Sequence, residues 1–363
     1  AGFDALSAEW EKLESGISPR TPFASPAWCR LWWTHFNRSG LACRDQMRVY
    51  AVRRADGALV GVAPMFLTSR PGWGIVRTRE LQFFGADPYV TELRGPICAP
   101  DNTVAVVEAL SAHISAMRES DWVQWRGLRY PDGVDHPELR LREDDRLNIV
   151  DHFIQAPGSW DAFKASLPRN IKESLRKCYN SLKRENIDFE FRVVSTPSDT
   201  LAAVNCFLDL HKARADLEGT VKHPDVFDSK QARALLRDYC RHLAQRDALR
   251  IFQLVIDGKV VATRIGFVLG DEIYLYFSGY DQDYARFSVM TTTVAEAIKY
   301  SIEQGVRIVN LSTGTDVSKT RWRPSQVVYH GGYEVYAAAK SRVAFRFVEA
   351  MRERKPQFVP RPA

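Results

Sequence analysis

The sequence lacks the signals that assign a chain to a membrane, metal or disulfide class. No apolar run approaches the roughly 18–20 residues that a bilayer-spanning helix requires. The six cysteines form no Cys-x-x-Cys pair and none has a histidine at ligand spacing, so we expect no structural zinc and no other bound metal. Reduced, mostly buried thiols are typical of a cytoplasmic protein, which is the location that we expect.

A strong excess of charge of one sign is also missing. The 363 residues carry 50 Lys+Arg and 44 Asp+Glu, for a formal net charge of +6. This excess is too small and too evenly spread to predict a nucleic-acid partner. With 45% hydrophobic and 26% charged residues, the composition is that of a globular protein, and the length predicts two domains.

Familiar catalytic motifs are absent as well. There is no Gly-x-Gly-x-x-Gly between a strand and a helix, no Walker-type phosphate loop, no His-Glu-x-x-His and no Gly-x-Ser-x-Gly. A dinucleotide-binding fold, a P-loop enzyme, a zinc protease of that type and a serine hydrolase therefore have no support.

What is present is an order of elements that occurs twice. Asp56-Gly57 and Asp257-Gly258 each separate two strand-like segments, which is a strong hairpin signal. A helix and a strand follow in each half, at about 102–117 and 122–125, and at about 288–304 and 307–311. We therefore predict the α/β class, with an N-terminal domain over 1–155, a second domain over 156–355 and a Pro-rich tail over 356–363.

A strongly charged helix is predicted between the two halves, from about 168 to 185. Basic residues recur there at steps of three, four and seven, on one face, and an apolar face lies opposite. The basic residues are Arg169, Lys172, Arg176 and Lys183, and the apolar ones are Ile171, Leu175, Cys178 and Leu182. The basic face is either solvated or part of an anion site.

The loop at 278–287 leads directly into the helix that begins near Ser288. Exposed N–H groups and the positive dipole end of a helix bind phosphate readily, and Arg286 stands close to this start. Every helix has such an end, so this pattern alone is weak.

Strand, hairpin, strand, helix, strand is the core order of the GNAT acyltransferases. Residues 158–335 resemble the CelD-type domain of that superfamily, which is related to the FemAB peptidoglycan aminoacyltransferases. The matching segments are 159–163, 167–170, 174–177, 211–214, 254–262, 276–281 and 311–319. The opening segment, 22–28, resembles the first half of the same family.

The resemblance implies tandem GNAT-like domains, with mixed sheets flanked by helices and acyl-CoA as cosubstrate. An amine would attack the thioester carbonyl directly. Main-chain groups of Phe277, Ser278 and Gly279 would polarise that carbonyl. The pyrophosphate would lie on the turn formed by Arg286, Phe287, Ser288, Val289 and Met290.

Two departures from the family pattern stand out. The pyrophosphate turn contains no glycine, so binding must tolerate side chains there. Ser318-Lys319 stands where the family commonly shows Tyr-Lys, which removes an obvious general acid for the leaving thiolate. Tyr280, Tyr284 or a water would take that role.

His211 is the first candidate for the general base, because it matches the family's His-x-x-Arg spacing to Arg214. Asp281 and Asp316 are the other candidates, although an aspartate that caps a turn is equally consistent with the position of Asp316. Arg169, Arg176, Arg214, Lys319 and Arg321 are expected to hold an anionic part of the acceptor or of CoA, the alternative being solvated surface charge.

The acceptor is expected to be a small-molecule or lipid amine of the cell envelope. The resemblance favours a sphingoid base, as in bacterial ceramide synthases, or an amino sugar. A basic amphipathic helix at about 336–353 would either contact an anionic membrane from its cytoplasmic face or pack on the second domain. Its apolar stripe comprises Val343, Ala344, Phe347, Val348 and Met351.

Two rival functions stay open. One is FemAB-like transfer from aminoacyl-tRNA, although no 40-residue heptad-rich insertion is visible in the sequence. The other is a degenerate accessory protein that binds polysaccharide or lipid.

Overall fold

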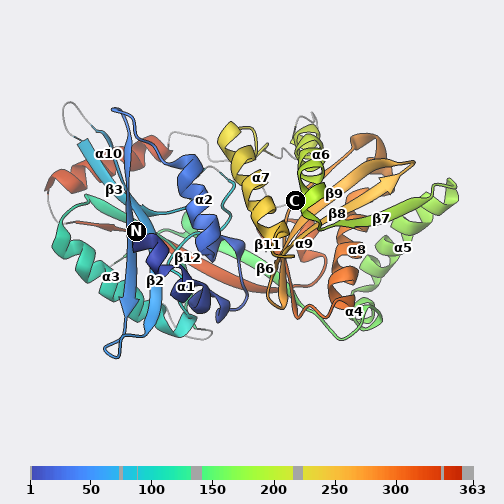
Figure 1. The fold of residues 1–363 in the computed structure, drawn as a ribbon, viewed down its shortest axis with the longest axis horizontal. Coiled ribbons are helices and arrows are strands. Elements are labelled where there is room, and N and C mark those ends of the chain that lie inside the picture. The colour runs from blue at the N-terminus through green and yellow to red at the C-terminus, as the bar shows by residue number, and fades with distance from the viewer. Residues whose placement is uncertain are drawn as a thin grey trace. The chain divides into compact units, whose positions relative to one another are not determined.

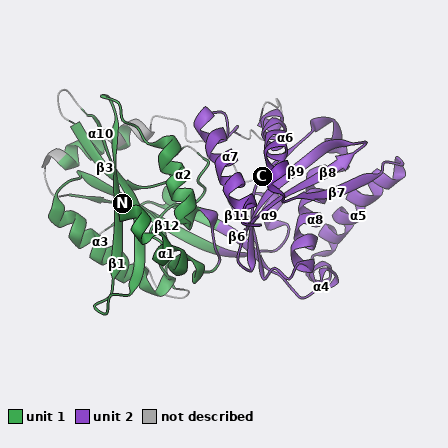
Figure 2. Ribbon diagram, viewed as in Figure 1, with its two compact units in different colours: residues 1–18, 23–150, 327–363 green, residues 19–22, 151–326 purple. Residues whose placement is uncertain are grey.

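The computed structural model describes residues 2–72, 77–87, 89–131, 141–215, 224–336 and 339–353 (Figure 1). Its contacts divide the chain into two compact units (Figure 2). Unit 1 comprises residues 1–18, 23–150 and 327–363, and unit 2 comprises residues 19–22 and 151–326.

Unit 1 contains a mixed sheet. Its strands follow the order β1-β2-β3-β4-β12, and β5 also pairs with β12. Neighbouring strands are antiparallel except for β3 and β4. The strands are β1 (Arg44–Arg53), β2 (Leu59–Pro71), β3 (Arg77–Phe83), β4 (Trp122–Leu128), β5 (Arg142–Glu143) and β12 (Ser325–Val335). The helices are α1 (Gly2–Ser15), α2 (Pro26–Phe36), α3 (Thr103–Met117) and α10 (Ala339–Glu353).

Unit 2 is built in the same way, with the strand order β6-β11-β10-β9-β8-β7 and a single parallel pair, β10 and β11. Its strands are β6 (Ile149–Gln155), β7 (Phe189–Val194), β8 (Leu249–Ile256), β9 (Lys259–Leu269), β10 (Glu272–Tyr280) and β11 (Ile308–Thr313). Its helices are α4 (Trp160–Ser166), α5 (Arg169–Arg184), α6 (Pro197–Ala215), α7 (Lys230–Ala244), α8 (Val289–Glu303) and α9 (Val317–Thr320). Short 3-10 helices lie at Pro22–Ala24, Pro100–Asn102, Asp145–Leu147 and Gln282–Phe287.

The predicted repetition of one α/β unit is confirmed. Three antiparallel strands, a helix and a parallel strand follow one another as β1-β2-β3-α3-β4 and again as β8-β9-β10-α8-β11. The second hairpin forms because Asp257 and Gly258 adopt φ of 51° and 76°, the pair of left-handed conformations that a two-residue turn requires.

Helices cover both faces of the unit 2 sheet (Figure 1). Along β10 the side chains alternate, so Ile273 and Leu275 join the apolar cluster with α5 and α8. Tyr276 points to the opposite face, where it packs on Phe267 and Phe227 beside α6 and α7. The predicted amphipathic helix is α5, whose apolar residues Ile171, Leu175, Cys178 and Leu182 are buried.

The expected boundary at 155/156 placed β12 and α10 in the second domain, whereas the contacts group them with unit 1. The reason is strand pairing, because β12 hydrogen-bonds to β4 and β5. Phe345 of α10 packs on Trp122 and Tyr333 of the same unit. The Pro-rich tail at 356–363 lies outside the described residues.

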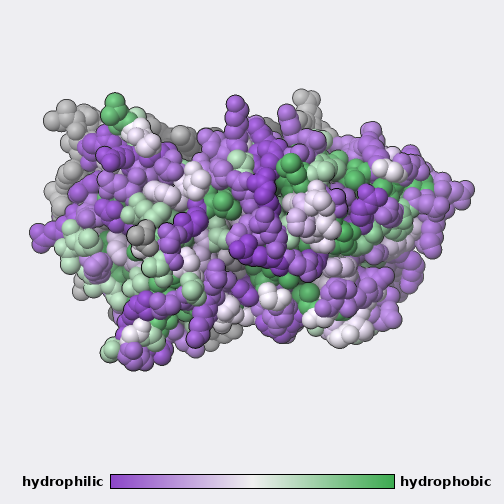
Figure 3. All heavy atoms as spheres, in the orientation of Figure 1, coloured by the Kyte–Doolittle hydropathy of each residue, from purple (hydrophilic) through white to green (hydrophobic). Residues whose placement is uncertain are grey.

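The expected apolar stripe of α10 is described only in part. Ala344 packs on the small cluster around Phe345, whereas Val343 is 58% exposed. The side chains of Phe347, Val348 and Met351 lie outside the described ones. In the parts of the chain that the structure describes, no helix is both long and apolar enough to cross a bilayer. Hydrophilic residues predominate on the face drawn in Figure 3.

Candidate functional site

The central parallel strands of unit 2 separate partway along their length. β10 and β11 pair only at Glu272–Ile308, Ile273–Val309 and Tyr274–Asn310. Beyond this point β10 continues to Tyr280 alongside β9, and β11 continues to Thr313 alongside β6. Each strand also has an irregularity there, between Leu275 and Ser278 and between Asn310 and Thr313. The facing edges of the two strands therefore lose their mutual ladder of hydrogen bonds.

An arginine side chain lies where the strands part. Nη2 of Arg264, on β9, donates to the carbonyl of Leu275 at 2.8 Å and to that of Leu311 at 3.2 Å. Arg264 is only 7% exposed. Its guanidinium satisfies one carbonyl on each strand just beyond the last paired residues, and so stabilises the separation of the strands.

A buried polar chain shapes the far end of β11. The side-chain amide of Asn310 donates to Asp151 of β6 at 2.7 Å. Its oxygen accepts from the amide of Ser312, also at 2.7 Å, and Ser312 has a φ of 77°, in the left-handed region. These bonds bend the strand just before Gly314 and offset the strain of a non-glycine residue in this conformation.

Helix α6 approaches β10 very closely, because Gly279 carries no side chain. A Cβ at Gly279 would lie 2.5 Å from the main-chain nitrogen of His211. This contact brings Nδ1 of His211 to 3.0 Å from the carbonyl oxygen of Ser278. A carbonyl only accepts, so Nδ1 carries the proton and Nε2 carries the lone pair.

The remaining surroundings of His211 are mostly apolar. The ring is 5% exposed and contacts Phe207, Phe227 and Phe277, with centroids 5.6, 5.2 and 5.7 Å away. Nε2 has no hydrogen-bond partner among the described residues and lies 3.9 Å from a carboxylate oxygen of Asp225. Burial lowers the pKa of His211, although Ser278 and Asp225 oppose the shift. His211 is therefore a neutral imidazole with an unpartnered proton acceptor.

The structure brings several of the predicted residues together at this end of β10. Arg214 lies on α6 one turn after His211, and its Nη1 donates to Oγ of Ser278 at 3.3 Å. Its guanidinium lies 5.7 Å from the ring centre of Tyr280. Burial lowers the pKa of Arg214, while Tyr280 and Asp316 raise it, which places Asp316 near the same group.

Asp316 takes the capping role that the sequence left open, and Asp281 also caps a helix start. Asp316 accepts from the amide of Ser318 at 3.1 Å and from Nζ of Lys319 at 2.7 Å. Burial, the largest single effect, raises the pKa of Asp316. Lys319 and Ser318 oppose burial and together lower this pKa to about 2. Asp281 caps the 3-10 helix and pairs with Lys259 at 2.6 Å, which lowers the pKa of Asp281. Such ionised, paired carboxylates are weak bases, so the geometry favours His211.

Helix α8 starts at the expected turn. Ser288 has φ 54° and ψ 36°, a conformation that favours glycine, and it makes no side-chain cap. The residue in the turn therefore differs from the family pattern, while the backbone conformation is one that glycine adopts easily. The N–H groups of the first turn, from Val289 onward, have no acceptor within the helix. Phe287 and Val289 are themselves buried, and Met290 packs against the apolar clusters beneath.

The predicted basic residues divide into two groups. Arg321 reaches the first turn of α8, donating to Thr291 at 3.1 Å and to Ser174 of α5 at 3.0 Å. Arg286 is exposed, pairs with Glu185 at 3.1 Å and lies over the ring of Phe287 at 4.5 Å. Arg169, which is 93% exposed and pairs with Glu173, and Arg176 both lie on the outer face of α5.

Two residues beside the parted strands escaped the sequence analysis, Arg264 and His152. His152 lies on β6 and is 3% exposed, and neither ring nitrogen meets a described group in full hydrogen-bond geometry, although the main chain of Gly314 raises its pKa. The available signal was a polar residue inside an apolar strand pattern, Asp151-His152 before Phe153 and Arg264 between Thr263 and Ile265. Such residues require a partner or a function.

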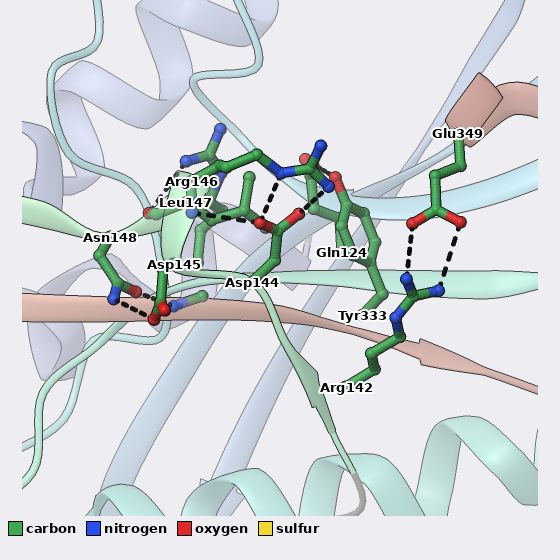
Figure 4. A network of polar contacts seen from close by, with 11 residues as sticks. Gln124, Arg142, Asp144, Asp145, Arg146, Leu147, Asn148, Tyr333 and Glu349 are labelled. Atoms are coloured by element: carbon green, nitrogen blue, oxygen red, sulfur yellow. Dashed lines mark hydrogen bonds and ion pairs between the residues drawn. The ribbon is translucent and has the colours of Figure 1, made fainter. Parts of the chain in front are cut away.

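The equivalent strands of unit 1 also part early, since β3 and β4 pair only at Glu80–Trp122 and Leu81–Val123. Side chains from three segments interact beside this separation. Gln124 accepts from Arg94 at 2.8 Å. It donates to Tyr333 at 3.0 Å (Figure 4). Burial and the nearby Arg126 lower the pKa of Arg94 to about 9. In unit 1 a side-chain network therefore forms at Gln124, the residue after the last β4 residue that pairs with β3.

Comparison with known proteins assigns the fold. Residues 169–322 match the acetyltransferase (GNAT) domain family. The structure of FemX superimposes with a TM-score of 0.59, at 10% identity over 94% of this chain and 98% of that chain. A conserved protein of unknown function from Bacteroides thetaiotaomicron VPI-5482 gives 0.54, at 15% identity over 91% and 97%. A C-terminal domain of a putative lysylphosphatidylglycerol synthetase from Agrobacterium fabrum gives 0.52, at 12% identity over 96% and 97%. A search of the curated proteins gave no match.

Proposed function

We propose that this chain, whose residues 169–322 match the acetyltransferase (GNAT) domain family, transfers an acyl group from acyl-CoA to a primary amine. The observation that carries the proposal is the separation of β10 from β11 beyond Tyr274, next to the turn that begins α8. A thioester arm can lie along the freed edge of β10, and an anionic group can bind the open N–H groups of α8.

Each part of the donor has a candidate binding group. Main-chain groups of Phe277, Ser278 and Gly279 line the freed half of β10 and would polarise the thioester carbonyl. The pyrophosphate would bind the first turn of α8, where Val289, Met290 and the guanidinium of Arg321 supply N–H donors. Arg286 would reach the same anion only by leaving Glu185.

Direct transfer requires an uncharged amine, a proton acceptor and a protonated leaving group. The amine nitrogen attacks the thioester carbon, a C–N bond forms and the C–S bond breaks. Nε2 of His211 accepts the proton that the attacking nitrogen releases, and Asp225 stabilises the imidazolium from 3.9 Å. The departing thiolate then takes this proton, so His211 returns to its neutral form, and Tyr280 or a water can relay it.

The acceptor that we propose is an envelope amine, either a sphingoid base or an amino sugar. The family resemblance supports this substrate class. Arg214 and Lys319, close to Ser278 and Asp316, would hold a polar or anionic part of such an acceptor. Contact of the basic helix α10 with an anionic membrane surface would bring the protein to a lipid amine.

Thiol release tests the proposal directly. Acyl-CoAs from acetyl to palmitoyl are incubated with small amines, amino sugars and sphingoid bases, and free CoA is measured. His211→Gln should reduce turnover by roughly 10²–10⁴-fold, because the general base is lost. His113→Gln, an exposed histidine of α3, is the matched control and should keep wild-type turnover. Unchanged turnover in His211→Gln would remove His211 from the mechanism.

FemAB-like transfer from aminoacyl-tRNA is the second candidate, favoured by the FemX-like fold over 94% of the chain. Calorimetric and thermal-shift titrations separate the candidates. Acyl-CoA at ~100 times its dissociation constant should add ~2.7 kcal/mol to stability. No thermal shift with acyl-CoA of any acyl chain length, together with observed transfer from charged tRNA, would establish the second candidate. No response to either donor would favour the accessory protein.

A further inference from the structure

We propose that His152 removes a proton from the acceptor ammonium before His211 acts, so that the site uses two buried histidines, one on each side of the parted strands. The inference rests on the proposed function and adds a second proton-accepting residue to it. His211 borders the β10 side through Ser278, and His152 lies on β6, the strand that pairs with β11.

The position of His152 follows from the strand register. Phe153 pairs with Asn310 and Asp151 pairs with Thr313, so His152 stands opposite the irregular segment of β11. Its neighbours on β6 point to the other face of the sheet, because side chains alternate along a strand. Asp151 accordingly bonds to Asn310, and His152 points to the opposite face of the sheet from Asp151.

A buried histidine with a free ring nitrogen is costly unless a ligand supplies a partner. His152 is 3% exposed, and neither nitrogen meets a described group in full hydrogen-bond geometry, although the main chain of Gly314 lies near enough to raise its pKa. An acceptor amine placed beside the ring would satisfy one nitrogen, which is a physical reason for a strand to carry histidine here.

The groups around His152 favour its neutral form, which is the form that can accept a proton. Burial lowers the pKa of His152 and Lys319 adds to this shift, while Asp316 and the main chain of Gly314 oppose it. Lys319 and Asp316 form an ion pair at 2.7 Å on α9. The lysine disfavours a second ammonium nearby, and the aspartate offers it a transient partner.

Two proton acceptors balance the reaction of an alkylamine. Such an amine arrives as an ammonium ion and becomes nucleophilic only after it loses one proton, which His152 accepts and passes to solvent. After attack, the nitrogen loses a second proton, which His211 accepts and the leaving thiolate takes. The products are the amide, the free thiol of CoA and one proton in solution.

A weakly basic nucleophile separates this role from a structural one. Hydroxylamine and anilines are uncharged at neutral pH, so they need no first deprotonation. His152→Gln should reduce kcat/KM for an alkylamine by roughly 10²–10³-fold. It should leave kcat/KM for hydroxylamine unchanged, and His113→Gln should leave both unchanged.

Equal losses with both nucleophiles in His152→Gln would show a structural role and overturn the proposal, as would undiminished turnover of the alkylamine. If this variant does not fold, the wild-type protein still provides a test, because the imidazole of His152 can be titrated by NMR. Its signals should respond to added alkylamine, and no response at saturating amine would overturn the proposal. Absence of thiol release by the wild-type protein with either nucleophile would instead refute the proposed function.

Discussion

Gly279→Ala tests the contact that positions His211. An added Cβ would lie 2.5 Å from the main-chain nitrogen of His211 and 2.7 Å from the carbonyl carbon of Leu210. Ordinary contact begins at 3.4 Å, and 3.4 minus 2.5 leaves a required movement of about 0.9 Å between α6 and β10. Both contacting atoms belong to the backbone, so no side chain can rotate away to accommodate the methyl group.

The expected losses follow from this movement. Overpacking costs about 1–3 kcal/mol, and a weakened bond from His211 to Ser278 adds about 1 kcal/mol. A displacement of about 1 Å at a catalytic group reduces turnover by roughly 10²-fold. Urea unfolding followed by tryptophan fluorescence measures the first effect, and thiol release from acyl-CoA measures the second.

Gly158→Ala is the matched control, because nothing lies within 4 Å of its added Cβ and its φ does not require glycine. We expect the unfolding free energy of this variant to stay within about 0.5 kcal/mol of wild type. If Gly279→Ala behaved like Gly158→Ala in both measurements, the close packing of α6 on β10 would be refuted.

Three further variants test the parted strands and their surroundings. Arg264→Met leaves two buried carbonyls without this donor, at about 1–3 kcal/mol each, so urea unfolding should show a loss of about 2–6 kcal/mol, and an unchanged midpoint would contradict the bridge. Asn310→Ala removes the amide that Asp151 accepts from, and should lower the unfolding free energy by about 1–3 kcal/mol at pH 7; full stability would show that this bond is dispensable. Asp316 has its folded-state pKa lowered from 3.8 to about 2, so the unfolded chain binds the proton first, and stability present above pH 3.8 is lost as the pH falls to about 2. Asp316→Asn should flatten the stability profile in that window, and a wild-type slope would assign the loss to other groups.

Much of the secondary structure was predictable because its determinants are local. The Asp257-Gly258 turn forms a hairpin through two backbone conformations that these residues tolerate. The alternation of apolar and basic residues from Arg169 to Arg184 specified a helix with one buried face before any partner was known. The helix that begins after Ser288 was placed within a residue of its observed start.

The candidate site was only partly accessible from the sequence. The spacing of His211 and Arg214 placed both on one helix face, and in the structure both contact Ser278. Asp281 was a candidate base and Asp316 either a base or a cap, and only their ion pairs with Lys259 and Lys319 favoured the capping role for both. No sequence rule indicated that His152 would lie beside Asp316 and Lys319.

The sequence by itself determined the order of elements, the duplication and the α/β class, because turns, helix caps and apolar periodicity act within a few residues. Only the tertiary structure decided that β12 joins the sheet of unit 1, that β10 and β11 separate after three paired residues, and that Arg264 bridges them. These outcomes depend on how segments far apart in the chain satisfy each other's buried hydrogen-bonding groups. That energy belongs to the assembled sheet, and no single strand carries it.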